Sequence, residues 1–198
     1  MSALRADLAL ISEWIAPKSR VLDVGCGDGA LLAHLQKTRE VGGYGVEIDA
    51  GNVVRCIDSG VNVIQADVDD GLRGFESGSF DYVVMSQTLQ ALQRPDRVVA
   101  EMLRVGKTAI ITFPNFGHWR VRLGLLAGRM PNTTALPEEW YDTPNIHLCT
   151  VADFDDLCKE HGWNVLRRSL LDREVYDDWL IKLSPNLFAE NALYMLQR

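Results

Sequence analysis

A glycine-rich run is the part of this sequence best suited to hold a small molecule. It reads Asp23-Val24-Gly25-Cys26-Gly27-Asp28-Gly29 and directly follows an apolar segment that is typical of a buried strand. Glycines at such a position let the backbone turn sharply and approach a ligand closely, because no Cβ atom stands in the way. The same pattern is also compatible with a simple tight turn between a strand and a helix. Taken alone, the run therefore predicts a ligand-binding loop without naming its ligand.

Two further carboxylates follow the next two apolar segments. Glu47 lies near the end of segment 44–48, where a carboxylate would accept hydrogen bonds from both hydroxyls of a ribose. Asp67 follows segment 61–65, where a carboxylate can accept a hydrogen bond from the exocyclic amine of adenine. Either acid alone is readily explained as a helix cap or a solvated turn residue. Acids after three successive strands, beside a glycine loop, favour a nucleoside-binding site.

The pattern Gly25-x-Gly27-x-x-Ala30 also satisfies the fingerprint of dinucleotide-binding proteins. A dinucleotide would place two phosphate charges at this loop, where Asp23 and Asp28 would repel them. At an effective dielectric constant near 20, such repulsion costs on the order of a few kcal/mol. S-adenosylmethionine has no phosphate and carries a sulfonium and an ammonium group instead. The acids therefore favour S-adenosylmethionine or S-adenosylhomocysteine over NAD.

The spacing of apolar residues predicts alternating strands and helices around this loop. Strands are expected at 20–24, 44–48, 61–65, 80–85 and 108–113, and helices at 4–15, from 30, at 50–59 and at 95–105. Such alternation implies a mostly parallel sheet with helices on both faces. The pattern breaks down over residues 114–150 and then resumes with a helix at 151–162 and strands at 163–168 and 191–196. We therefore expect one α/β domain over residues 1–198, with an insert or lid at 114–150.

Composition narrows the class of protein. The chain has 198 residues and a net charge of −7, which disfavours binding to nucleic acid. Its four cysteines show no metal-ligand spacing, its four histidines lie far apart, and no metal site is predicted. The charged N-terminus does not resemble a signal peptide, and no segment approaches the length of a membrane span. We expect a cytoplasmic protein.

The motifs resemble those of the class I S-adenosylmethionine-dependent methyltransferases. Residues 23–29, 44–49, 65–68 and 79–84 match the first four motifs of that superfamily. The resemblance implies a Rossmann-like fold with a seven-stranded sheet whose last strand, 191–196, is antiparallel. It also implies a set of cofactor-binding residues. These are Asp23, Gly25, Gly27 and Gly29 for the methionine and ribose parts, Glu47 and Ile48 for the ribose, Asp67 and Val68 for the adenine, and Gln87.

Three other segments, 86–90, 113–120 and 140–150, closely resemble the narrower MetW family. That family belongs to bacterial methionine biosynthesis. The resemblance of this chain to that family implies that it associates with homoserine O-acyltransferase (MetX), whose activity the family supports. It does not imply an established methyl acceptor.

A methyl-transferring enzyme would need a group that orients or deprotonates its acceptor. The candidates are His118, Tyr141 and His147, of which the two histidines could titrate near neutral pH. Each is equally compatible with a structural hydrogen bond inside the insert. The sequence therefore leaves open whether the chain is an enzyme of the methyltransferase class.

The insert also carries a local reversal of charge. Residues 102–137 contain no Asp or Glu, and apolar residues alternate with arginines over 119–127. This predicts a basic helix, which could be a lid packed on the core, a docking surface for an acidic partner or a cradle for a carboxylate substrate. A membrane-surface helix is disfavoured by the acidic remainder of the chain. If the partner is MetX, Trp119, Arg120 and Arg122 are the expected contacts.

Two functions remain open at this point. The chain could be a partner protein that holds S-adenosylmethionine or S-adenosylhomocysteine and supports the acyltransferase. Alternatively, it could be an active methyltransferase that acts on a small metabolite. The cofactor motifs do not separate the two, because binding and transfer use the same loop.

Overall fold

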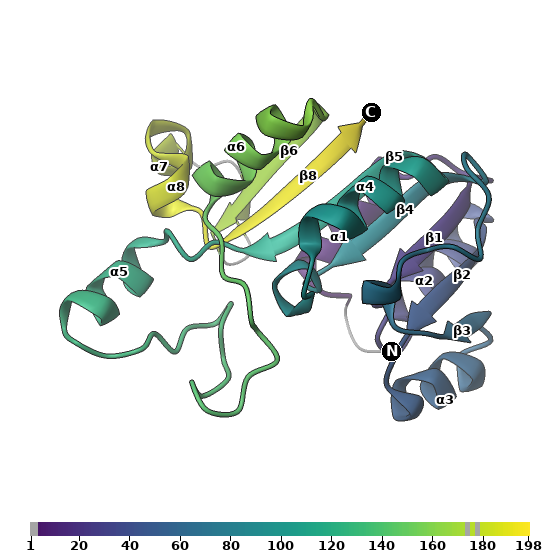
Figure 1. The fold of residues 1–198 in the computed structure, drawn as a ribbon, viewed down its shortest axis with the longest axis horizontal. Coiled ribbons are helices and arrows are strands. Elements are labelled where there is room, and N and C mark those ends of the chain that lie inside the picture. The colour runs from purple at the N-terminus through teal and green to yellow at the C-terminus, as the bar shows by residue number, and fades with distance from the viewer. Residues whose placement is uncertain (1–3, 173–174, 177–178) are drawn as a thin grey trace.

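The computed structural model describes residues 4–172, 175–176 and 179–198. Its centre is a mixed sheet with the strand order β3-β2-β1-β4-β5-β8-β6-β7 (Figure 1). The strands are β1 (Arg20–Val24), β2 (Gly42–Glu47), β3 (Val63–Gln65), β4 (Phe80–Ser86), β5 (Gly106–Pro114), β6 (Asn164–Asp172), β7 (Val175–Tyr176) and β8 (Asn191–Gln197). Strands β1 to β5 are parallel, and β8 lies antiparallel between β5 and β6. The predicted seven strands and the antiparallel last strand are confirmed; β7 is an additional two-residue strand on the edge of β6.

The described part of the chain contains eight helices. They are α1 (Ala6–Trp14), α2 (Ala30–Arg39), α3 (Ala50–Asp58), α4 (Pro95–Val105), α5 (Trp119–Leu126), α6 (Val151–His161), α7 (Trp179–Leu183) and α8 (Pro185–Phe188), with 3-10 turns η1 (Val68–Asp70) and η2 (Leu89–Ala91). Local sequence sets several of the boundaries. Pro95 opens α4 at a position that needs no N–H donor, and Thr150 and Asp153 form a reciprocal capping box at the start of α6.

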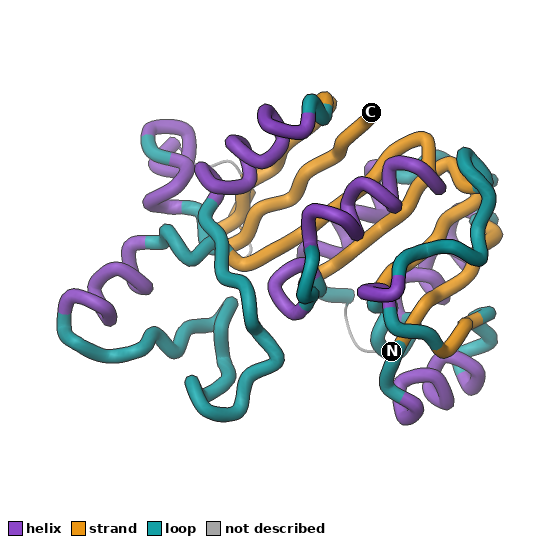
Figure 2. The backbone as a smooth tube through the Cα atoms, viewed as in Figure 1, coloured by secondary structure: helices purple, strands orange, loops and turns teal. Residues whose placement is uncertain are grey.

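Helices lie on both faces of the sheet (Figure 2), and the core forms two layers, one on each face. Side chains alternate along each strand, so Val83 and Met85 of β4 pack on one face and Val84 on the other. Buried residues of α4 and α6 complete the first layer. Buried residues of α1, α2 and α3 complete the second. Helices thus cover both faces, as the alternation of elements predicted.

The insert leaves the sheet after β5 and returns to it at α6. Its two ends are fastened together, because the Phe116 N–H donates to the Cys149 carbonyl at 3.0 Å. The buried Asn115 amide donates to the carbonyls of Asn186 and Ala189, and its oxygen accepts from the N–H groups of Gly117 and Val151. Between these ends, α5 and the following chain project away from the sheet (Figures 1 and 2).

The predicted helix at 119–127 exists as α5, but it does not pack its leucines on the core. Of its eight residues, all of them described, only Val121 is buried. The interpretation of this helix as a lid packed on the core is therefore wrong. The physical reason is its placement, because α5 stands off the sheet rather than against it (Figure 1). Within the described residues, no helix has the length and apolar character needed to cross a bilayer.

Candidate functional site

A cavity of about 380 Å³ opens at the carboxyl ends of the parallel strands. This is the edge of an open α/β sheet where ligands generally bind. Its lining residues are Gly25, Val46, Glu47, Ile48, Ala66, Asp67, Val68, Asp69, Gln87, Thr88, Ala91, Leu92, Gln93 and Ile146. Six of the nine residues expected to bind the cofactor are among them. The volume lies within the range of small-molecule sites.

The glycine loop adopts the conformation that its sequence predicts. Gly25, Gly27 and Gly29 have φ angles of +69°, +56° and +77°, a region that side chains with a Cβ atom rarely enter. A Cβ at Gly25 would lie 2.5 Å from the Thr88 hydroxyl oxygen, whereas one at Gly27 would meet no protein atom within 4 Å. Gly25 is therefore required for packing within the protein. Gly27 keeps open the space next to the loop.

The amides of the loop are already engaged by the protein. The N–H groups of Gly25 and Cys26 both donate to the Val46 carbonyl, and that of Gly29 donates to the Cys26 carbonyl. Two more donate to carboxylates: Gly27 to Glu47 at 2.8 Å, and Ala30, the first residue of α2, to Asp28 at 3.1 Å. A diphosphate normally binds to amides of this kind at the start of the helix. Here two of those amides already have carboxylate acceptors.

Glu47 is held more firmly than its expected role requires. The side chain is buried, and one carboxylate oxygen accepts from the N–H groups of Ile48 and Asp49, both at 2.9 Å. The other oxygen accepts from Gly27. A carboxylate has about four acceptor positions, so three are occupied before any ribose arrives. Glu47 thus also fixes the glycine loop to the end of β2, a role that the spacing of residues did not predict.

Asp23 is buried beside the loop, with 3% of its surface exposed. Burial raises the pKa of Asp23 to about 7; the Arg5 guanidinium opposes this shift and the Glu47 carboxylate adds to it. A cation placed near Asp23 would therefore stabilise its ionised form.

Arg5 reaches the site from the N-terminal segment, and sequence reasoning missed it. Its guanidinium donates to both carboxylate oxygens of Asp7 and, at 2.9 Å, to the hydroxyl of Ser86 at the end of β4. Ser86 in turn lies 3.2 Å from the hydroxyl of Thr112 on β5. The network joins residues up to 81 positions apart, and no local spacing signals such a contact.

The remaining cofactor candidates line the cavity in fixed positions. Exposed Asp67 accepts from the N–H of Asp69, and Ile48 presents an apolar side chain that is 60% exposed. Gln87 has a φ of +55°, which is strained for a residue with a Cβ, and its side-chain amide donates to Asn191. Its backbone N–H donates to the carbonyl and hydroxyl of Thr112. This residue joins β4 and β5 at the cavity.

The three catalytic candidates do not come together. His118 is buried and packs on Trp119, with ring centroids 5.7 Å apart. Tyr141 is 71% exposed on the insert. His147 lies closest to the cavity, since its neighbour Ile146 lines the cavity and its own ring nitrogen is 3.2 Å from the Gln93 carbonyl. Their assignment as catalytic residues stays a prediction.

Comparison with known structures shows the fold. An S-adenosylmethionine-dependent methyltransferase from Mesorhizobium loti superposes with a TM-score of 0.68 at 18% identity, over 98% of this chain and 98% of that chain. The [4+2]-cyclase SpnF superposes with a TM-score of 0.67 at 15% identity, over 96% of this chain and 80% of that chain. The same fold thus occurs in a protein named as a methyltransferase and in one named as a cyclase, so the fold alone does not assign an activity.

Comparison of sequences shows the family. The family model for the methionine biosynthesis protein MetW matches residues 5–196. A bifunctional methionine biosynthesis protein MetXA/MetW from Rhodopirellula baltica is 35% identical over 98% of this chain. The chain spans about a third of that relative's length. This chain belongs to the MetW family of methionine biosynthesis proteins.

Proposed function

We propose that this chain binds S-adenosylmethionine or S-adenosylhomocysteine in the cavity at the strand ends, and supports a homoserine O-acyltransferase, MetX. One observation carries the ligand assignment: the N–H groups of Gly27 and Ala30 donate hydrogen bonds to the carboxylates of Glu47 and Asp28. A loop arranged in this way offers negative charge, which suits a sulfonium or ammonium group and opposes a diphosphate.

In this proposal each residue contacts a particular part of the ligand. Gly27 leaves room for the methionine and ribose parts, Gly25 and Gly29 give the loop its turn, and Asp23 faces the positive charge. Glu47 accepts hydrogen bonds from the ribose hydroxyls at the carboxylate acceptor position that the backbone N–H groups leave free. Ile48 and Val68 provide apolar walls for the adenine, Asp67 accepts its amine, and Gln87 closes the cavity toward β5.

The surroundings of the three candidates favour a binding role over methyl transfer, because His118 is buried and Tyr141 is 71% exposed on the insert. A transferase would need such a group beside the reacting carbon. His147 is the one of the three whose neighbour lines the cavity. It is therefore the residue on which the alternative, an active methyltransferase, depends.

The partner half of the proposal draws on the relative whose name joins MetXA and MetW in one chain. Fusion holds two parts at a high effective concentration, which benefits proteins that act together. The purified acyltransferase is expected to turn over faster in the presence of this chain than in its absence. Equal rates at saturating concentrations of the chain would contradict the supporting role.

Asp23 makes ligand binding depend on pH. A cationic ligand favours the ionised carboxylate, so it must displace the proton that Asp23 holds below a pKa of about 7. Affinity for S-adenosylmethionine is therefore expected to rise, by roughly fivefold to tenfold, between pH 6 and pH 7.5, with about half a proton released per ligand at pH 7. Calorimetry in two buffers of different ionisation enthalpy measures both quantities.

Asp23→Asn is the control for this pH dependence. The amide keeps the shape of the side chain and cannot titrate, so the proton release should vanish and the affinity should become flat over the same range. A wild-type profile that is flat, or one that survives in Asp23→Asn, would show that Asp23 does not sense the ligand.

A further inference from the structure

The projecting part of the insert, residues 117–148, which we term the arm, exposes apolar side chains that a folded chain normally buries. On α5, Leu123 is 54% exposed, Leu125 is 44% exposed and Leu126 is 83% exposed. Farther along, Met130 and Trp140 are 54% and 69% exposed. A helix with apolar residues around most of its circumference requires a cover, and clustered exposed apolar residues mark interaction sites.

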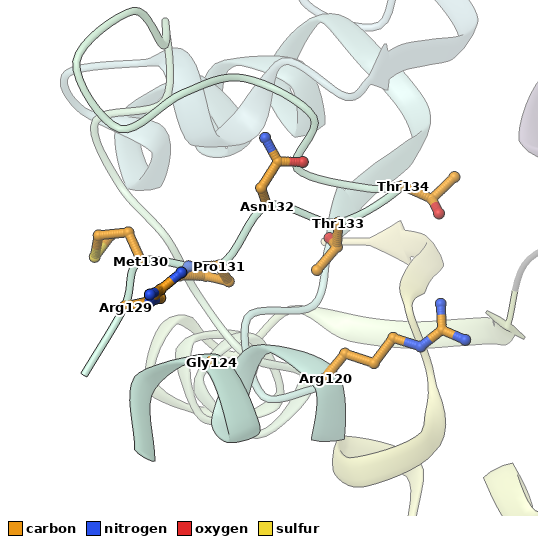
Figure 3. Close-up of a pocket in the computed structure, with 8 residues that line it drawn as sticks. All are labelled: Arg120, Gly124, Arg129, Met130, Pro131, Asn132, Thr133 and Thr134. Atoms are coloured by element: carbon orange, nitrogen blue, oxygen red, sulfur yellow. The ribbon is translucent and has the colours of Figure 1, made fainter. Parts of the chain in front are cut away.

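The arm is also hollowed. A shallow hollow of about 620 Å³ lies between α5 and the segment that follows it (Figure 3). Its lining residues are Arg120, Gly124, Arg129, Met130, Pro131, Asn132, Thr133 and Thr134. Arg120 and Arg129 lie at opposite sides of this hollow and do not converge on one point (Figure 3). This arrangement does not fit a cradle for a small carboxylate, and it suits a broad surface better.

The arginines of the arm are partly committed to the arm itself. The Arg122 guanidinium donates to the Gly117 carbonyl at 2.6 Å, and that of Arg120 stacks over the Trp119 ring at 5.2 Å. With Arg129 they make residues 117–137 positive, because that part of the arm contains no acid. Glu138, Glu139 and Asp142 lie in the remainder of the arm, near Trp140, and the chain as a whole has a net charge of −7. The α5 part of the arm therefore fits a partner whose apolar groove has an acidic rim.

The root of the arm holds this surface in place. The bond from Phe116 to Cys149 closes the insert at its base, and Asn115 joins that base to the starts of α6 and β8 through buried hydrogen bonds. A fixed base means that binding does not have to order the whole insert.

We propose that the arm is the docking surface for the homoserine O-acyltransferase, with Leu123, Leu126 and Trp140 inserted into its apolar groove. This inference rests on the proposed function for the choice of partner. The relative from Rhodopirellula baltica supports that choice, because its name places MetXA in the same chain and this chain accounts for 33% of its length. Trp and Arg are among the residues that dominate binding at protein interfaces, and α5 places exposed apolar side chains beside Arg120 and Arg122.

The test is the affinity of the full chain for the purified acyltransferase, measured by calorimetry. Leu123→Ser with Leu126→Ser is expected to weaken binding at least roughly thirtyfold, and Trp140→Ala by a similar factor. The matched control is Val54→Ser with Ile57→Ser on α3, because these side chains are equally exposed, at 56% and 62%, and lie at the other end of the molecule (Figure 1). The control should bind like the wild type. Unchanged S-adenosylhomocysteine binding in every variant shows that the fold is intact.

The possible outcomes test the docking surface and the choice of partner separately. If the wild type binds the acyltransferase and the arm variants bind equally well, the arm is not the surface, although the partner assignment stands. If the wild type does not bind the acyltransferase, the docking surface and the partner half of the proposed function both fail. Self-association of the wild type, or its capture by phosphatidylglycerol vesicles, that is lost in the arm variants would overturn the choice of occupant.

Discussion

Gly27→Val is expected to abolish measurable binding of S-adenosylhomocysteine, a loss of at least roughly a hundredfold in affinity. The φ of Gly27 is +56°, and a Cβ built there meets no protein atom within 4 Å. The new side chain would therefore extend into the space that we assign to the ligand. A β-branched residue in this backbone region also costs about 1–2 kcal/mol.

A matched variant separates these two effects. Gly162 ends α6 with a φ of +66°, and a Cβ there also meets no atom within 4 Å. Gly162→Val thus imposes similar backbone strain far from the loop, and it should lower the melting temperature without changing affinity. Normal binding by Gly27→Val would show that the glycine loop is only a turn. Equal losses of affinity in the two variants would assign the effect to general strain.

The arrangement of the sheet follows from patterns that can be read along the chain. Buried parallel strands contain short apolar runs, such as 109–111 in β5, and the helices between them have their own period. The elements that were missed are the short ones: β7 has two residues, α7 has five and α8 has four. Segments of this length have no period to detect. Their positions depend on tertiary contacts.

The candidate site was predicted to the extent that strand ends define it. Glu47 ends a parallel strand, and Asp67 and Gln87 each follow one, so the topology alone brings them to one edge and one cavity. Arg5 and Ile146 reach the same region from the N-terminus and from the insert. Neither carries a motif, and their approach depends on how distant segments pack. The second role of Glu47, as an acceptor for three backbone amides, depends on backbone geometry that residue types do not encode.

The insert also shows a limit of prediction from sequence. The absence of acids over 102–137 predicted an unusual surface, but it allowed both a lid and a docking helix. The decisive observation is burial, because a lid would cover its leucines and α5 exposes three of them. The amphipathic spacing of a helix indicates which residues share a face. It does not tell whether that face meets the same chain or another protein.

A calorimetric titration of the wild-type chain with S-adenosylhomocysteine and, separately, with NAD tests the central claim most directly. The N–H groups of Gly27 and Ala30 already donate to the carboxylates of Glu47 and Asp28, which also place negative charge where a diphosphate would lie. We therefore predict that S-adenosylhomocysteine binds with a Kd in the micromolar range or below, and that NAD binds at least roughly a hundredfold more weakly. Equal affinity for the two ligands, or the absence of S-adenosylhomocysteine binding, would contradict the account.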